Sequence, residues 1–345
     1  MADLLTSVDV DEPASGERGR LARYVGGKIG GGLVSLFLVT VLGFFLFRVM
    51  PGDPVRTMTR GAPMTDQQIA ALRERLGLDQ PLWKQFLDYL GALAHGDLGT
   101  SYTYSRPVAD LIVERIGPTL LLAGTATVLA IGLGLWMGSR AAWKHGGGFD
   151  KIATSAALTL WSVPTFWLGL ILLMALGVGF GPIPGLFPVG GISSPDVPPG
   201  VLPHVLDVAH HLVLPAITMV AVIYAEYLMV MRSSLLEEMG EGYLNTARAK
   251  GLREDLVRSR HAVPNALLPA VTLIFLRLGL VVAGAITVET VYSWPGIGLL
   301  TFEALRVPDP PLLQGVFLVL AGSVVVMNVL ADLLYRVLDP RVRES

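Results

Sequence analysis

Six long apolar stretches limit the folds open to this sequence more than any other feature. Each is long enough for a helix to cross a hydrocarbon core of about 30 Å at about 1.5 Å per residue. In lipid the backbone must pair its own polar groups, and no series of alternating strands occurs, so we expect helices rather than a barrel. The stretches are residues 31–50, 118–138, 152–178, 212–231, 269–291 and 315–337. The predicted fold is an all-α membrane protein with six transmembrane helices.

The composition supports the same class of protein. Apolar residues make up 52% of the chain, charged residues make up 16%, and the mean hydropathy is +0.58, which is too apolar for an ordinary soluble protein. A net charge of -2 leaves no surplus of positive charge for nucleic acid, so membrane lipid is the expected surrounding. The absence of cysteine excludes disulfides, thiolate metal sites and cysteine nucleophiles.

The distribution of Lys and Arg predicts how the chain crosses the membrane, because positive residues near span ends stay on the cytoplasmic side. They gather before the first span, between the second and third, between the fourth and fifth, and at the C-terminal end. The two shorter outer segments hold almost none. We therefore expect both termini in the cytoplasm, with residues 1–28 a disordered cytoplasmic leader and residues 29–50 the first transmembrane helix.

The outer segments differ in character. Residues 51–117 carry a helical pattern in which Thr65 is a candidate N-cap and Gln68 occupies the capping-box position, so we expect a small extracytoplasmic helical subdomain. Residues 179–203 are rich in Gly and Pro and predict an irregular loop. Pro164 interrupts the third span, where we expect a packing kink.

The cytoplasmic loop at residues 232–266 carries the strongest functional signal of the predicted core, residues 118–345. Acidic residues come early and basic residues late, which complements a helix dipole, and Gly251 is a natural C-terminal stop. We expect a helix, a turn and a second helix along the membrane surface. A rigid helix on this face is an element through which a partner protein could move the bundle.

This loop resembles the EAA loop of ABC importer permeases, whose pattern is Glu-Ala-Ala, three residues, Gly, and then a hydrophobic-x-Leu-Pro element. Residues 245–247 (Asn-Thr-Ala) stand at the triplet without its Glu, and Gly251 follows at the expected spacing. Residues 263–264 (Val-Pro) stand where the closing Leu-Pro belongs. The residues that the resemblance assigns to coupling with an ATPase are Glu241, Asn245, Thr246, Ala247, Arg248, Lys250, Gly251 and Pro264.

Other motifs extend the resemblance over nearly the whole chain and make it specific to the dipeptide/oligopeptide branch of the binding-protein-dependent ABC importer permeases. Their order and spacing carry the signal, since each motif alone would be weak. They are FRVMPGDP (47–54), LGLDQP (76–81), HGDLG (95–99), SVPTFW (162–167), VETVYSWPGIG (288–298) and LDPR (338–341).

The resemblance implies a type I ABC importer permease in the bacterial plasma (inner) membrane, paired with a homologous second permease as a heterodimer. Two ATP-binding subunits or domains would hold ATP and Mg, and an extracytoplasmic binding protein would deliver di- or oligopeptides. No G-x-x-x-x-G-K-S/T phosphate loop occurs, so we expect this chain to bind no cofactor and to catalyse no reaction. His204, His210 and His211 lack the carboxylates or thiolates that would favour a metal site.

Ionisable residues inside spans are candidates for a translocation pathway, because each costs roughly 2.5–3.5 kcal/mol at the bilayer centre. Arg277 lies near the middle of the fifth predicted span. It could meet a peptide carboxylate in a water-filled path, or pair with Glu226 of the fourth span. Glu289 and Asp332 lie nearer span ends, where we expect access to water and favour a structural role. The candidate pathway residues are Arg277, Glu226 and Glu289.

Three other interpretations stay open. The same ABC machinery could carry nickel complexes, glutathione or another small solute. An ion-coupled secondary transporter would use Arg277 and Glu226 as its relay and would work as a single chain, but it would leave the EAA-like loop unexplained. An intramembrane enzyme has no visible catalytic constellation, since neither H-E-x-x-H nor G-x-S-x-G occurs.

Overall fold

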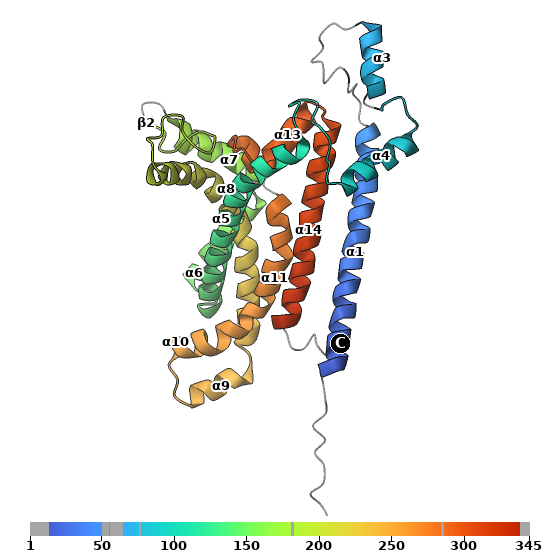
Figure 1. Cartoon of the computed structure of the whole chain (residues 1–345). Coiled ribbons are helices and arrows are strands. Elements are labelled where there is room, and N and C mark those ends of the chain that lie inside the picture. Colours follow the sequence, from blue (N-terminus) through green and yellow to red (C-terminus); the bar gives the residue numbers. More distant parts are fainter. Residues whose placement is uncertain are drawn as a thin grey trace, which may run out of the picture.

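The computed structural model describes residues 14–49, 55, 65–75, 77–180, 183–283 and 286–338, and this part of the chain is almost wholly helical. Figure 1 shows a bundle of long helices with shorter helices at its two ends. The elements are α1 (Ala14–Val49), α3 (Asp66–Arg75), α4 (Leu82–Ala94), α5 (Val108–Trp143), α6 (Gly148–Ser162), α7 (Thr165–Leu172), the π-helix η1 (Leu173–Val178), β1 (Gly179–Phe180), β2 (Ile183–Pro184), α8 (Val201–Glu238), α9 (Gly242–Ala249), α10 (Glu254–Val257), the π-helix η2 (Arg258–Ala262), α11 (Val263–Ala283), α12 (Ile286–Val291), α13 (Ile297–Arg306) and α14 (Pro310–Leu338).

Among the described residues, four helices are long and apolar enough to cross a membrane by length and composition. They are α1, α5, α8 and α14, and each contains most or all of one predicted span. The number rises to five if the bent pair formed by α6 and α7–η1 is one span. The predicted span at 269–291 runs through α11 and α12, but residues 284–285 lie outside the described residues. The total of six therefore stays a prediction.

Helices α5 and α8 form the most extensive contact in the bundle because small residues let their backbones approach closely. A Cβ atom at Gly134 would overlap the backbone of Tyr224, and one at Gly138 would overlap that of Leu228. Helix α14 packs against both α11 and α1 (Figure 1). An ion pair of 2.7 Å between Lys28 Nζ and an oxygen of Asp332 joins α1 to α14, which gives Asp332 a structural role.

Two helices begin earlier than the predicted spans that they contain. Helix α1 begins at Ala14, so residues 14–28 are helical rather than part of a disordered leader, and residues 1–13 lie outside the described residues. Helix α5 begins at Val108 and contains Pro118, which the apolar pattern places at the start of the span. The first turns of α5 are buried against α13 and α14, and this packing outweighs the hydrogen bond that Pro118 removes.

The third predicted span is not one straight helix. Helix α6 ends at Ser162 and α7 begins at Thr165, with a bend of 101° between the two helical segments. Proline disfavours helical geometry in the residue before it, and Val163 is extended, with φ −80° and ψ 129°. The break expected at Pro164 is present, but it redirects the chain instead of producing a packing kink.

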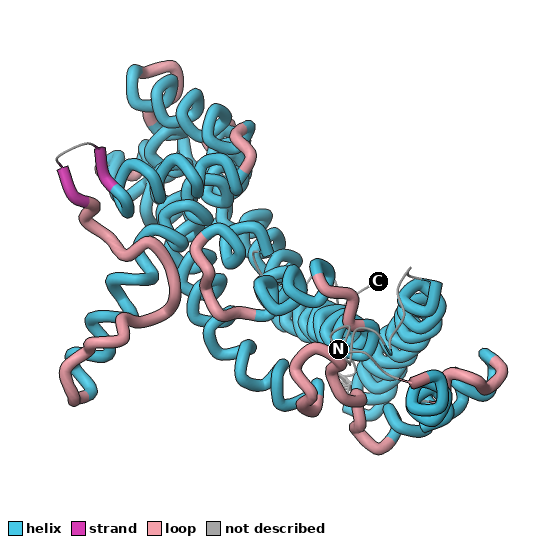
Figure 2. Tube along the Cα trace, turned by 90° about the horizontal axis from the view of Figure 1, so that it is seen from above, coloured by secondary structure: helices cyan, strands magenta, loops and turns pink. Residues whose placement is uncertain are grey.

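The two segments expected on the outer side agree with the sequence in part. Helix α3 starts with the predicted capping box, because the N–H of Thr65 donates to Oε1 of Gln68 at 2.9 Å and the N–H of Gln68 donates to Oγ1 of Thr65 at 3.4 Å. Strands β1 and β2 pair as a short antiparallel ribbon at the edge of the molecule (Figure 2). The chain after β2 is irregular as predicted, except that α8 already begins at Val201.

A buried carboxylate ties the segment before α5 to the start of α14. Asp309 is fully buried and accepts hydrogen bonds from the hydroxyl of Ser101 at 2.6 Å and the N–H of Thr103 at 2.9 Å. Its second oxygen accepts from the N–H of Leu312 at 3.2 Å, so Asp309 also caps α14. The segment before α5 is therefore fixed to the bundle near α13.

Candidate functional site

Helix α9 is held against the ends of three long helices, at the end of the bundle away from α3 and α4 (Figure 1). Leu244 and Ala247 point inward and are 0% and 7% exposed. They belong to a buried cluster with Ala142 of α5, Met231 and Leu235 of α8, and Ala266 of α11. Val257 and Ala262, from the connection between α9 and α11, complete the cluster. Because a buried apolar face resists sliding, α9 forms a rigid platform rather than a loose loop.

The end of α9 has the glycine stop that the sequence predicts. The N–H of Gly251 donates to the carbonyl of Arg248 at 2.9 Å, and the N–H of Leu252 donates to the carbonyl of Ala247 at 3.4 Å, as in a Schellman motif. Gly251 has φ +77°, and an added Cβ atom would meet no atom within 4 Å. The backbone conformation, not crowding, therefore requires glycine here.

The predicted coupling residues differ in burial: one is buried, one is partly buried, and the rest are exposed. Arg248 is partly buried and joins α9 to α10, since its Nε donates to Oε1 of Glu254 at 2.9 Å and its Nη1 donates to Oδ1 of Asn245 at 3.2 Å. Ala247 lies inside the apolar cluster. The exposed residues are Glu241, Asn245, Thr246, Lys250, Gly251 and, near the start of α11, Pro264. Their part in coupling stays a prediction.

The sequence reasoning missed Tyr243, whose hydroxyl connects three elements of this loop. It accepts a hydrogen bond from Nδ2 of Asn265 at 2.9 Å, and it donates toward the carboxylate of Glu238 or the carbonyl of His261. Burial first, and then the hydrogen bond to Glu238, raise the pKa of Tyr243 above its ordinary value. The phenol is therefore a donor throughout the physiological pH range. The signal in the sequence that could have pointed to Tyr243 is an aromatic residue two positions before the triplet.

A second missed contact fixes the helix that leads into the loop. Arg232 and Asp150 form a bidentate ion pair, with Nε–Oδ1 at 2.6 Å and Nη2–Oδ2 at 3.0 Å. Oδ2 of Asp150 also accepts from the N–H of Gly146 at 2.9 Å. The pair ties the start of α6 to the end of α8. The sequence shows Arg232 as a topological charge but not its partner, which is distant along the chain.

Arg277 pairs with Glu226, which was one of the two partners expected for it from the sequence. Nη2 of Arg277 lies 2.6 Å from Oε1 of Glu226, and the two side chains are 45% and 27% exposed. The pair joins α11 to α8 and remains open on one side. Whether that side lines a pathway stays a prediction.

Glu289 does not have the access to water that its place near a span end predicts. Its side chain is fully buried, and its oxygens accept hydrogen bonds from the hydroxyl of Thr119 at 2.9 Å and the N–H of Leu299 at 3.1 Å. Nε1 of Trp294 donates to the carbonyl of Pro118 at 2.8 Å close by. Glu289 thus connects α12 and α13 to α5, and it lines no open path in this conformation.

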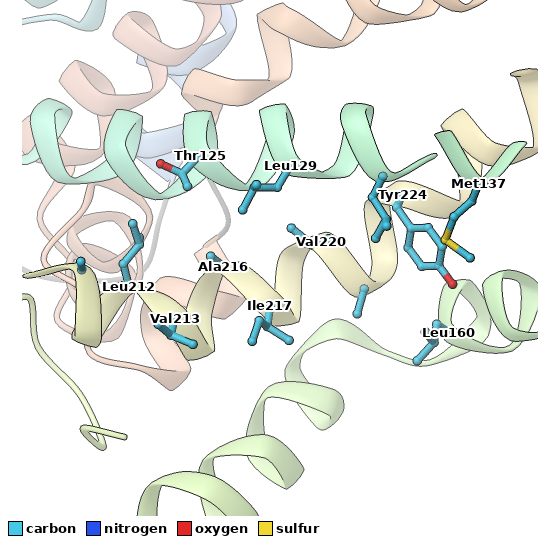
Figure 3. Close-up of a pocket in the computed structure, with 13 residues that line it drawn as sticks. Thr125, Leu129, Met137, Leu160, Leu212, Val213, Ala216, Ile217, Val220 and Tyr224 are labelled. Carbon is cyan, nitrogen blue, oxygen red and sulfur yellow. The ribbon is translucent and has the colours of Figure 1, made fainter. Parts of the chain in front are cut away.

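A groove of about 670 Å³ lies between α5, α6 and α8, and Figure 3 shows side chains of these helices around it. The lining is apolar apart from the hydroxyl groups of Thr125 and Tyr224. None of Arg277, Glu226 and Glu289 lines it. A groove of this kind offers no partner for the charged ends of a peptide, so we do not assign the pathway to it.

Two of the three histidines named above, His210 and His211, contact backbone carbonyls. Nε2 of His210 lies 3.0 Å from the carbonyl of Leu186, and Nδ1 of His211 lies 2.9 Å from that of Asp207. The part of the chain that the structure describes contains no group of three or more His, Cys, Asp or Glu residues placed to hold a metal ion.

Comparison with known proteins decides the family. The model of the family "Binding-protein-dependent transport system inner membrane component" matches residues 130–344, and the model of its N-terminal part matches residues 21–123. The chain belongs to this family. It is therefore the permease of a binding-protein-dependent ABC importer, a non-catalytic, multi-pass subunit of the inner membrane.

The permease has several close relatives with names that describe their cargo. It is 39% identical to "Dipeptide transport system permease protein DppB" of Escherichia coli (strain K12) over 320 residues, which cover 89% of this chain and 94% of the relative. It is 38% identical over 332 residues, 93% and 99% of the chains, to "Di/tripeptide transport system permease protein DppB" of Pseudomonas aeruginosa (strain UCBPP-PA14). "Glutathione transport system permease protein GsiC" of Escherichia coli O6:H1 (strain CFT073) is 35% identical over 324 residues, 94% and 99% of the chains.

Dependence on a binding protein implies that the permease works with such a protein and with an ATPase partner.

Proposed function

We propose that this permease moves di- or oligopeptides inward, coupled to ATP hydrolysis through α9. The observation that carries the proposal is the exposed polar face of α9 on a buried apolar base, which can receive force from a partner and pass it to three long helices. The partners are two ATP-binding subunits or domains that hold ATP and Mg, a homologous second permease and an extracytoplasmic peptide-binding protein. Both termini and α9 then lie in the cytoplasm.

The ion pair of Arg277 and Glu226 indicates where the translocation pathway could run. A guanidinium that is 45% exposed in an apolar span is costly against lipid, so the open side of the pair must face water or another protein. We propose that it faces the water-filled path between the two permeases, where Arg277 can meet the carboxylate of a peptide. The buried Glu289 then holds the outer end of the bundle together.

Transport by the assembled complex in proteoliposomes tests the cargo. We expect uptake of labelled dipeptides that depends on ATP and on the binding protein. Strong uptake of nickel complexes, or of glutathione but no dipeptide, would favour those cargoes, and uptake by this chain alone would favour an ion-coupled transporter.

Loop variants test the coupling. Deleting residues 246–251 should leave the ATPase partners active but remove uptake, because hydrolysis no longer moves α9. Replacing Glu114, an exposed residue at the other end of the molecule, with Ala is the matched control and should leave uptake unchanged. Unchanged uptake in the deletion would reject the role of α9.

A further inference from the structure

Helix α4 has an apolar side that the described part of the chain leaves uncovered. Trp83 and Leu87 lie one turn apart and are 65% and 56% exposed, and Leu82 beside them is 53% exposed. Lys84 and Asp88 occupy another side of the same helix and are also exposed. A helix with separate apolar and charged sides needs an apolar neighbour for the first side.

Aromatic contacts fix the depth of α4 relative to the first membrane span. The ring of Phe86 lies 5.2 Å from that of Phe44 and 5.9 Å from that of Phe45, and the ring of Tyr89 lies 5.6 Å from that of Phe44. Phe44 and Phe45 belong to the last turn of the candidate span Val25–Phe47 in α1. Helix α4 therefore lies where the apolar part of α1 ends (Figure 1).

Helix α1 carries an exposed apolar stripe of its own next to the contact with α4. Leu38, Leu42 and Leu46 follow one another along α1 at single-turn spacing and are 54%, 66% and 60% exposed. Phe45, which Phe86 contacts, is 44% exposed beside them. Such a stripe on a membrane span is suited to contact with acyl chains, and the contact between Phe86 and Phe45 places α4 beside it.

We propose that α4 lies at the extracytoplasmic surface of the inner membrane. There it inserts Trp83 and Leu87 among the lipids and anchors the segment between α1 and α5. The indole suits this position because its ring is apolar and its N–H can bond to headgroups or water. Lys84 and Asp88 then face the aqueous side. The anchor holds α3 and the segment up to α5 at a fixed height above the bilayer.

The absence of native cysteine makes a direct test possible. Trp83→Cys, Leu87→Cys, Lys84→Cys and Asp88→Cys would each receive a nitroxide label in the full permease, assembled with its ATPase and second-permease partners in lipid nanodiscs. Collision rates with oxygen, which concentrates in lipid, are compared with those of a water-soluble nickel chelate. The ratio of oxygen to nickel collisions should be several-fold higher at 83 and 87 than at 84 and 88.

Equal ratios at all four positions, with free access to nickel, would overturn the proposal. So would shielding of positions 83 and 87 from both reagents, since that result indicates that another part of the assembled protein covers them. Leu87→Cys keeps Trp83 in place and is a small change at an exposed site, so it answers the question even if Trp83→Cys assembles poorly.

Discussion

Two polar clusters at opposite ends of the molecule differ in burial, and the difference separates stability from function. Around Glu289 the carboxylate, the hydroxyl of Thr119 and the ring of Trp294 are closed off from solvent. Around α9 the polar groups of Arg248 and Tyr243 stay partly accessible above an apolar base. Breaking the first cluster leaves buried groups without partners, whereas breaking the second only exchanges protein contacts for water. We therefore expect the first to govern folding and the second to govern coupling.

The largest expected effect is at Glu289. Glu289→Ala leaves the buried Thr119 hydroxyl and the partly buried Leu299 N–H without an acceptor, so the free energy of unfolding should fall by about 3 kcal/mol. Thermal unfolding of the purified permease in detergent measures it. The control is Glu254→Ala, which removes an exposed carboxylate near α9 and should leave Tm nearly unchanged. Equal losses in both variants would erase the contrast between the clusters.

Gly296→Ala should destabilise through overlap rather than lost hydrogen bonds. A Cβ atom there would collide with the carboxylate of Glu289 and the hydroxyl of Thr119, at a cost of about 1–3 kcal/mol. Gly132→Ala in α5 is the control because its Cβ meets nothing within 4 Å, and helical Ala is favourable. A Gly296→Ala variant as stable as its control would show that the buried cluster is loosely packed.

Gly251→Ala should affect coupling more than stability. Its φ of +77° makes Ala unfavourable by about 1 kcal/mol, and the end of α9 should shift to relieve this strain. We expect uptake per ATP hydrolysed to fall while Tm changes little, measured in proteoliposomes with all partners present. Gly242→Ala, at the open start of α9 with no positive φ, should transport normally. Identical transport by both variants would count against a mechanical role for this turn.

The smallest expected change in stability is at Arg248. Arg248→Ala breaks a partly exposed ion pair with Glu254, and such pairs contribute about 0.5 kcal/mol. Unfolding in detergent should shift only slightly, and added salt should shrink the difference further. A loss as large as that of Glu289→Ala would mean that the α9 cluster is a structural core.

Local patterns in the sequence predicted much of this structure. The capping box of Thr65 and Gln68, the stop at Gly251 and the break at Pro164 all depend on residues close together in the chain, and all three are present. Helix starts were harder, since Val108 and Ala14 lie in polar segments whose helicity comes from packing or from continuation of a longer helix.

Contacts between distant residues could not be derived from one sequence. Glu289 was expected near water because its place in the span was visible, but its partner Thr119 was not. The bidentate pair of Arg232 with Asp150 was missed for the same reason. Arg277 and Glu226 were paired as one alternative only because both are rare charges in apolar spans.

Cross-linking from α9 in the assembled transporter tests the central claim most directly. Thr246→Cys would carry a short photoreactive cross-linker on the exposed face of α9, and Gln67→Cys on α3 would carry it at the other end of the molecule. We predict an adduct between position 246 and an ATP-binding subunit, whose yield changes when ATP is added, and no such adduct from position 67. An adduct of position 246 with the extracytoplasmic binding protein, or none with the ATPase, would contradict the account.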